Sequence, residues 1–177
     1  ANPNDPIQYS QRENGQDTII DKNDNITLLM FSILMNDIEL ANIVLKYNPN
    51  VEQKDSRERN AVMYSILYNK NDSTQILNLL IQKKANLNCV LDIENKKYSI
   101  FTLACYKNFP NYLKMLMDNY VDVDYKTTPD LDTGLHICAR YGLIDPLKVL
   151  FSYDRINLDI LNKDGKKAIE LINDDNR

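Results

Sequence analysis

The chain has 177 residues, of which 44% are apolar and 26% are charged, a balance typical of a folded globular protein. This composition argues against wholesale disorder, and no apolar run approaches the roughly 20 residues that a membrane-spanning helix needs. The net charge of −4 argues against a nucleic-acid-binding protein, because such proteins present a concentrated basic face to the phosphates.

The N-terminal segment, residues 1–21, precedes the first regular pattern. Asp5 as an N-cap, Pro6 at the first helical position and Gly15 just beyond favour a short helix over residues 6–13. A helix here would cover the apolar flank of the next element, but a disordered tail or linker fits the same residues equally well. We therefore expect an N-terminal extension or a capping helix.

From about residue 22 a short polar mark recurs four times, each time after an apolar stretch of helical character. In each copy Val or Leu stands between Asn, Asp or Glu residues, and these central residues lie 36, 36 and 35 positions apart. A fixed period of this size is typical of helical repeat proteins. The central residues are Val51, Leu87, Val123 and Leu158, and the apolar stretches are 40–47, 76–81, 112–117 and 147–153.

A second pattern recurs between these marks. Residues 133–139 read Thr-Gly-Leu-His-Ile-Cys-Ala, which resembles the Thr-Pro-Leu-His-x-Ala signature of the ankyrin repeat family. Corresponding windows begin at Thr27, Asn60, Ser99 and Lys167, so that the spacings are 33, 39, 34 and 34 residues. An unrelated helical solenoid is the alternative, but the polar mark and the period favour ankyrin repeats.

The resemblance implies an all-α solenoid of about four to five helix-turn-helix repeats with short hairpin-like tips. The long interval of 39 residues predicts two loop insertions, near residues 68–73 and 90–97, because loops of a repeat array tolerate extra residues. The array is expected over residues 22–177. Its repeats would cover about 22–54, 55–93, 94–127, 128–161 and, as a partial C-terminal repeat, 162–177.

Four of the windows begin with a residue whose side chain can cap an inner helix by accepting a backbone N–H bond: Thr27, Asn60, Ser99 and Thr133. We expect the next apolar residues, Leu29, Val62, Phe101 and Leu135, to face the core, and the small residues Ser32, Ser65, Ala104 and Cys138 to let helices approach closely.

Two further sets of positions carry glycine in this family. After the inner helices the chain has Asn36, Asn69, Asn108 and Gly142, and Asn tolerates the left-handed backbone of such turns. After the outer helices it has Asn48, Lys84, Tyr120 and, less clearly, Arg155. A left-handed Lys or Tyr costs on the order of 1 kcal/mol, so either the backbone differs there or the repeats are individually weak.

Catalytic and metal-binding patterns are missing from the sequence. The single histidine, His136, falls at the signature position that braces repeat tips in this family, and a catalytic role is the weaker reading. The acidic residues Asp122, Asp124, Asp130 and Asp132 lack calcium-loop spacing, and the four glycines form no phosphate-binding motif. We therefore expect no enzyme, no cofactor, no metal and no small-molecule substrate.

The three cysteines, Cys89, Cys105 and Cys138, show no metal-ligand spacing and are too few for a disulfide framework. They predict buried thiols in a reducing compartment. The N-terminus also shows no signal-peptide pattern. We expect an intracellular protein, cytoplasmic or nuclear.

The resemblance implies that a partner binds the concave face, made of the tips and the exposed flank of the inner helices. Several of the aligned positions carry the Tyr, Met and Arg residues that are enriched in interface cores. The alternative is that Leu34 and Leu67 turn inward and the tyrosines only cover the core. The expected partner-binding residues are Leu34, Met35, Arg57, Arg59, Leu67, Tyr68, Tyr98, Tyr106, Lys107, Arg140 and Tyr141. Other tip positions read as exposed include Ile26, Lys96, Asp130, Asp132, Lys163 and Asp164.

We predict a protein–protein interaction module that binds a partner protein or peptide. The alternative is a regulatory or substrate-recruiting ankyrin domain of a larger enzyme or membrane protein. Nucleic-acid binding is a third, weaker possibility, because the tips carry the basic residues Arg57, Arg59, Lys96 and Lys97.

Overall fold

The computed structural model describes residues 9–13, 16–20 and 24–172. It divides into two compact units, each of which is described by itself. The N-terminal unit comprises residues 1–69 and 75–86, and the C-terminal unit comprises residues 70–74 and 87–177. None of the helices in the described ranges is long and apolar enough to cross a membrane.

The N-terminal extension differs from the expected helix. Tyr9–Glu13 forms strand β1, which pairs antiparallel with strand β2, Gln16–Ile20. The prediction of a helix over residues 6–13 is therefore wrong for residues 9–13, and residues 6–8 lie outside the described part. The missed signal was the Asn14-Gly15 dipeptide followed by β-branched Thr18, Ile19 and Ile20, since Asn-Gly is typical of tight hairpins.

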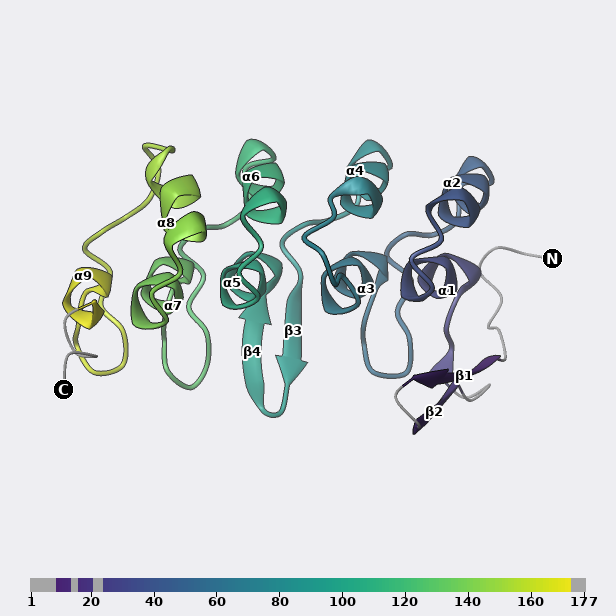
Figure 1. The fold of residues 1–177 in the computed structure, drawn as a ribbon, viewed down its shortest axis with the longest axis horizontal. Helices are drawn as coiled ribbons and strands as arrows, with labels where there is room; N and C mark the ends of the chain where they lie inside the picture. Colours follow the sequence, from purple (N-terminus) through teal and green to yellow (C-terminus); the bar gives the residue numbers. More distant parts are fainter. Residues whose placement is uncertain (1–8, 14–15, 21–23, 173–177) are drawn as a thin grey trace. The chain divides into compact units, whose positions relative to one another are not determined.

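The rest of the N-terminal unit consists of two helix pairs, α1 and α2 followed by α3 and α4 (Figure 1). The inner helix α1 contacts α3, and the outer helix α2 contacts α4. Both inner helices begin where their caps predict: the side chain of Thr27 accepts from Met30 N, and that of Asn60 accepts from Met63 N. The helices span Leu28–Leu34, Ile38–Lys46, Ala61–Leu67 and Gln75–Gln82.

The C-terminal unit repeats this pattern and adds a hairpin. Its inner helices α5, α7 and α9 lie side by side, while the outer helix α6 contacts α8 (Figure 1). The caps of α5 and α7 are Ser99 and Thr133, as predicted. The elements are β3 Val90–Ile93, β4 Lys96–Ser99, α5 Ile100–Tyr106, α6 Pro110–Asp118, α7 Gly134–Arg140, α8 Ile144–Phe151 and α9 Ala168–Leu171.

Both predicted insertions are present. Strands β3 and β4 form an antiparallel hairpin at the tip, turning at Glu94 and Asn95, which both have positive φ. The other insertion, residues 68–74, separates α3 from α4. Within the C-terminal unit, Asp72 of this loop accepts from Asn111 N at 2.7 Å and from Tyr112 N at 2.8 Å. The insertion thus caps α6, whose own N-cap residue, Phe109, makes no side-chain cap bond.

Left-handed backbone occurs at most of the predicted positions after inner helices. Asn36, Asn108 and Gly142 have φ values of 53°, 58° and 61°. Asn69 does not adopt positive φ; in the lengthened loop Asp72 takes that conformation instead, with φ 52°. The prediction for Asn69 is wrong because the insertion moves the turn along the chain.

The departures from glycine after the outer helices are accommodated without a change of backbone. Asn48, Lys84 and Tyr120 all have positive φ, between 49° and 59°. Arg155 does not; its guanidinium instead donates to the carbonyl oxygens of Val121 and Met117 at the end of α6. Lys84 and Tyr120 therefore carry the local strain that the sequence predicted.

The core follows the inner-helix pattern. The predicted core residues Leu29, Val62, Phe101 and Leu135 are all buried, as are the small residues at which helices approach each other. Cys89, Cys105 and Cys138 are buried thiols and not disulfides. Apolar side chains near the end of the C-terminal unit behave differently, since Phe151, Leu158, Ile169 and Ile172 remain exposed.

Candidate functional site

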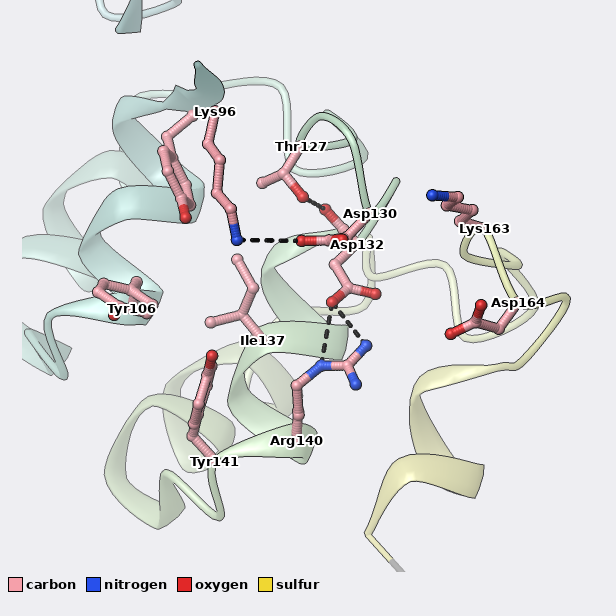
Figure 2. Close-up of a pocket in the computed structure, with 11 residues that line it drawn as sticks. Lys96, Tyr106, Thr127, Asp130, Asp132, Ile137, Arg140, Tyr141, Lys163 and Asp164 are labelled. Carbon is pink, nitrogen blue, oxygen red and sulfur yellow. Dashed lines mark hydrogen bonds and ion pairs between the residues drawn. The ribbon is translucent and has the colours of Figure 1, made fainter. Parts of the chain in front are cut away.

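A hollow of about 270 Å³ lies in the C-terminal unit, between the tips and the inner helices (Figure 2). Strand β4, the end of α5, the tip before α7 and α7 itself each contribute residues, and the next tip closes the far side. The hollow has one aromatic wall, one wall of paired charges and the buried side chain of Ile137. Its lining residues are Lys96, Tyr98, Tyr106, Thr127, Asp130, Asp132, Ile137, Arg140, Tyr141, Lys163 and Asp164.

Three tyrosines form the aromatic wall. The ring centroids of Tyr98 and Tyr106 are 6.0 Å apart, and those of Tyr106 and Tyr141 are 5.7 Å apart in an edge-to-face arrangement. Tyr106 is the last residue of α5 and Tyr141 follows the last residue of α7, so the packing of α5 on α7 brings them together. They are 51% and 56% exposed. The tyrosines are thus contiguous without being part of the core.

Asp132 and Arg140 make the fixed part of the charged wall. The Asp132 carboxylate accepts from Arg140 Nη2 at 2.8 Å and Nε at 3.2 Å, and its other oxygen accepts from Asn162 Nδ2 at 2.9 Å. Asp132 is only 5% exposed, so the expectation that it is an exposed tip residue is wrong. The same correction applies to Ile26, which is buried in the N-terminal unit. Buried charge requires such partners, and these bonds lock the Arg140 side chain.

Lys96 and Asp130 make a looser pair. The Lys96 ammonium lies 3.6 Å from the Asp130 carboxylate, and about half of each side chain is exposed. The negative charge of Asp130 raises the pKa of Lys96. An exposed pair at this distance contributes little to stability. Figure 2 shows Lys96 reaching across the hollow from β4 toward Asp130.

Bonds between successive tips fix the position of this charged wall. His136 Nδ1 accepts from Thr133 N at 3.3 Å, and His136 Nε2 lies 3.1 Å from the carbonyl oxygen of Lys166 in the next tip. Lys163 N also donates to Asp130 O at 3.0 Å. His136 is buried and occupies the tip-bracing role that the resemblance implied. The hollow therefore has a pre-formed frame.

Two predicted residues of the N-terminal unit, Arg59 and Tyr68, form a cluster with Asp55 and Tyr64. Arg59 donates to the buried Asp55 from Nε at 2.7 Å and lies over the ring of Tyr64. The rings of Tyr64 and Tyr68 are 5.2 Å apart, and Arg59 Nη1 lies 3.5 Å from the Tyr68 hydroxyl. Arg59 is therefore held inside its own repeat. Of the other predicted residues, Arg57 is exposed, whereas Leu34, Met35, Leu67 and Tyr68 are half-buried.

The hollow brings together some predicted residues and omits others. It contains Tyr98, Tyr106, Arg140 and Tyr141, while the half-buried Lys107 places its ammonium over the ring of Phe109. Thr127 and Ile137 were missed because neither lies at an aligned tip or helix-flank position. Four further lining residues were identified from the sequence only as tip positions: Lys96, Asp130, Lys163 and Asp164. That pattern located them at the tips but did not indicate their role in the hollow.

The described ranges hold no group of three or more His, Cys, Asp or Glu side chains that could bind a metal ion. Two of the four basic tip residues, Arg59 and Lys96, are paired with Asp55 and Asp130. A second hollow, of about 320 Å³, is lined mainly by apolar side chains, among them Phe151 and Ile172, and also by the ion pair of Lys167 with Asp159.

Comparison with known proteins agrees with the repeat geometry. A family model for ankyrin repeats, in three copies, matches residues 69–164, more than half of the chain. The chain is also 21% identical over 182 residues to a protein of Acanthamoeba polyphaga mimivirus named as an ankyrin repeat protein. That alignment covers 90% of this chain but only 24% of the viral protein. The capped inner helices, the paired outer helices and this family match lead to one conclusion: the chain belongs to the ankyrin repeat family.

Proposed function

We propose that this chain binds a partner protein or peptide through the tyrosine-lined hollow of its C-terminal unit. Ankyrin repeats are generally protein–protein interaction modules. The observation that carries the proposal is the contiguous array of Tyr98, Tyr106 and Tyr141, two of which are more than half exposed. Tyrosine provides a large contact area at low entropic cost and is enriched among interface hot spots.

Core and interface tyrosines respond differently to truncation. A core tyrosine leaves a cavity and destabilises the fold, whereas an exposed one leaves the fold nearly unchanged. Because Tyr106 and Tyr141 are exposed, each Tyr→Ala change should lower the free energy of unfolding by less than about 1 kcal/mol. At least one should weaken binding by about 2 kcal/mol, which is roughly thirtyfold in Kd.

The test uses the full chain and a displayed library of random peptides. Peptides selected on the wild-type chain are measured by calorimetry against the Tyr106→Ala and Tyr141→Ala variants. Tyr47→Ala is the control, because Tyr47 is 73% exposed but belongs to the N-terminal unit. Peptides that bind all three variants equally well, or variants that unfold easily, would contradict the proposal.

A regulatory or recruiting domain of a larger protein remains the second candidate. The observation that favours it is the length of the viral relative, of which the aligned region is only 24%. The interaction chemistry of the hollow is the same in either case. We further propose a reducing compartment for the chain, supported by its three buried thiols.

A further inference from the structure

Resting on the proposed function, we infer that the hollow accepts a basic side chain of the partner, an arginine or a lysine. This side chain would lie against Tyr106 and Tyr141 and pair with Asp130, replacing Lys96. The chain's own lysine thus marks the position of the partner's cation. Three observations support this: the charge pairing within the hollow, the tyrosine wall and the weak hold on Lys96.

Charge pairing decides which groups a partner can reach. Asp132 and Arg140 are locked to each other, and Asn162 also holds Asp132, so neither charge is available without breaking several bonds. Asp130, by contrast, is paired at 3.6 Å with a half-exposed lysine. A partner cation can therefore approach the Asp130 carboxylate at little cost, since Lys96 returns to water when it is displaced.

The tyrosines favour a cation over an anion. The hollow is lined by three basic and three acidic side chains, so formal charge alone does not select either sign. The faces of aromatic rings carry partial negative charge and attract ammonium and guanidinium groups. An incoming carboxylate or phosphate would face the tyrosine rings together with Asp130 and Asp164. The wall of tyrosines therefore makes the hollow selective for positive charge.

Lys96 already shows that a cation is stable at this position. It extends from β4 into the hollow, and the negative charge of Asp130 raises its pKa and so favours its charged form. Among the residues that the structure describes, its ammonium is held by one ion pair, to Asp130 at 3.6 Å, so it competes with the partner instead of excluding it. Arginine suits the position as well as lysine, because its planar group can stack on tyrosine while it pairs with a carboxylate.

The experiment tests whether the peptides selected above bind through a basic residue. Each selected peptide that depends on Tyr106 is resynthesised with every arginine replaced by citrulline and every lysine by norleucine. Losing the critical basic residue should weaken binding about tenfold or more, because citrulline and norleucine keep the bulk and lose the charge. Asp130→Asn should weaken binding of the unmodified peptide by a similar factor. Asp130 is half-exposed, so this variant should fold.

Lys96→Gln gives the sharper test, because removing the resident cation should tighten peptide binding by roughly threefold or more. Lys97→Gln is the matched control: it removes the same charge from the adjacent residue of β4, and Lys97 is not among the residues that line the hollow. The inference predicts tighter binding for Lys96→Gln and no comparable gain for Lys97→Gln. If both variants tighten peptide binding equally, the effect is due to long-range electrostatics and the inference is overturned.

The outcomes separate this inference from the proposed function. Peptides that require Tyr106 but contain no critical basic residue would overturn the cationic specificity and leave the binding site standing. Peptides that bind through an acidic residue would do the same and would point to Lys96 as the recognition group. If no selected peptide depends on Tyr106 or Tyr141, both proposals fail.

Discussion

Gly134 allows a direct test of how the inner helices pack. It occupies the place of proline in the family signature, at the first position of α7. A Cβ atom there would lie 2.6 Å from Phe101 Cε1 and 2.8 Å from Cys105 Sγ. Ordinary contacts between such atoms are about 3.5–4.0 Å, so both neighbours would have to move by about 1 Å. The close approach of α7 to α5 therefore requires glycine at this position.

Gly134→Ala should lower the free energy of unfolding by about 1–2 kcal/mol. Overpacking a filled core costs about 1–3 kcal/mol, and the better helix propensity of alanine offsets up to about 1 kcal/mol of this. Side-chain movement does not relieve the overpacking, because Phe101 and Cys105 are both buried and cannot turn into solvent. Urea titration followed by circular dichroism measures the difference, with tyrosine fluorescence as a second probe because the chain has no tryptophan.

A double-mutant cycle with Phe101→Leu is the control. The leucine side chain is shorter than the ring, so it should cost less in the Gly134→Ala background than in the wild type, with a coupling of about 1 kcal/mol. Gly134→Ala with wild-type stability or higher, or a coupling near zero, would show that α5 and α7 are not packed as described.

Two further changes test other parts of the fold. Lys84→Gly should stabilise the chain by about 0.5–1 kcal/mol and raise Tm, because Lys84 is exposed and has φ 59°, and the relief of left-handed strain exceeds the entropic cost of glycine. Asp55→Asn should destabilise it at neutral pH and progressively less in acid. Burial alone would raise the pKa of Asp55, but hydrogen bonds from Arg59 and Tyr64 outweigh it and lower the pKa below the ordinary 3.8. The contribution of Asp55 is therefore fully present above about pH 4 and is lost as the pH falls through its lowered folded-state pKa. Urea titrations of the wild type and Asp55→Asn at neutral and acid pH measure this. A difference in unfolding free energy that stays constant with pH would contradict it.

Local patterns predicted the helices well because the determining contacts are local. Thr27, Asn60, Ser99 and Thr133 each cap a helix by bonding to the backbone three residues ahead, so a short window of sequence contains the whole interaction. The same holds for the left-handed Asn108, which follows directly from the end of its helix.

The failures of sequence prediction involve distant partners or shifted turns. Asp132 was expected at the surface, but its burial depends on Asn162, thirty residues further along the chain. Asp72 was not recognised as the cap of α6 because its partners Asn111 and Tyr112 lie about forty residues away. Within the hollow, the alignment placed Tyr106 and Tyr141 at the exposed ends of their inner helices, but it could not show that Lys96 reaches Asp130.

The repeat geometry itself distinguishes structural from recognition residues among those predicted for binding. Before two of the capping positions, Asn60 and Thr133, the charged residue is used internally: Arg59 bonds to Asp55, and Asp132 bonds to Arg140. Truncating Arg59 would leave Asp55 buried without its main partner, so the loss would appear as instability and not as weaker binding. By contrast, Tyr106 and Tyr141 stand where inner helices end, and their exposed rings make no bond on which the frame depends. On the proposed function, the tyrosines at the ends of the inner helices therefore serve recognition, while the buried tip carboxylates Asp55 and Asp132 serve the fold.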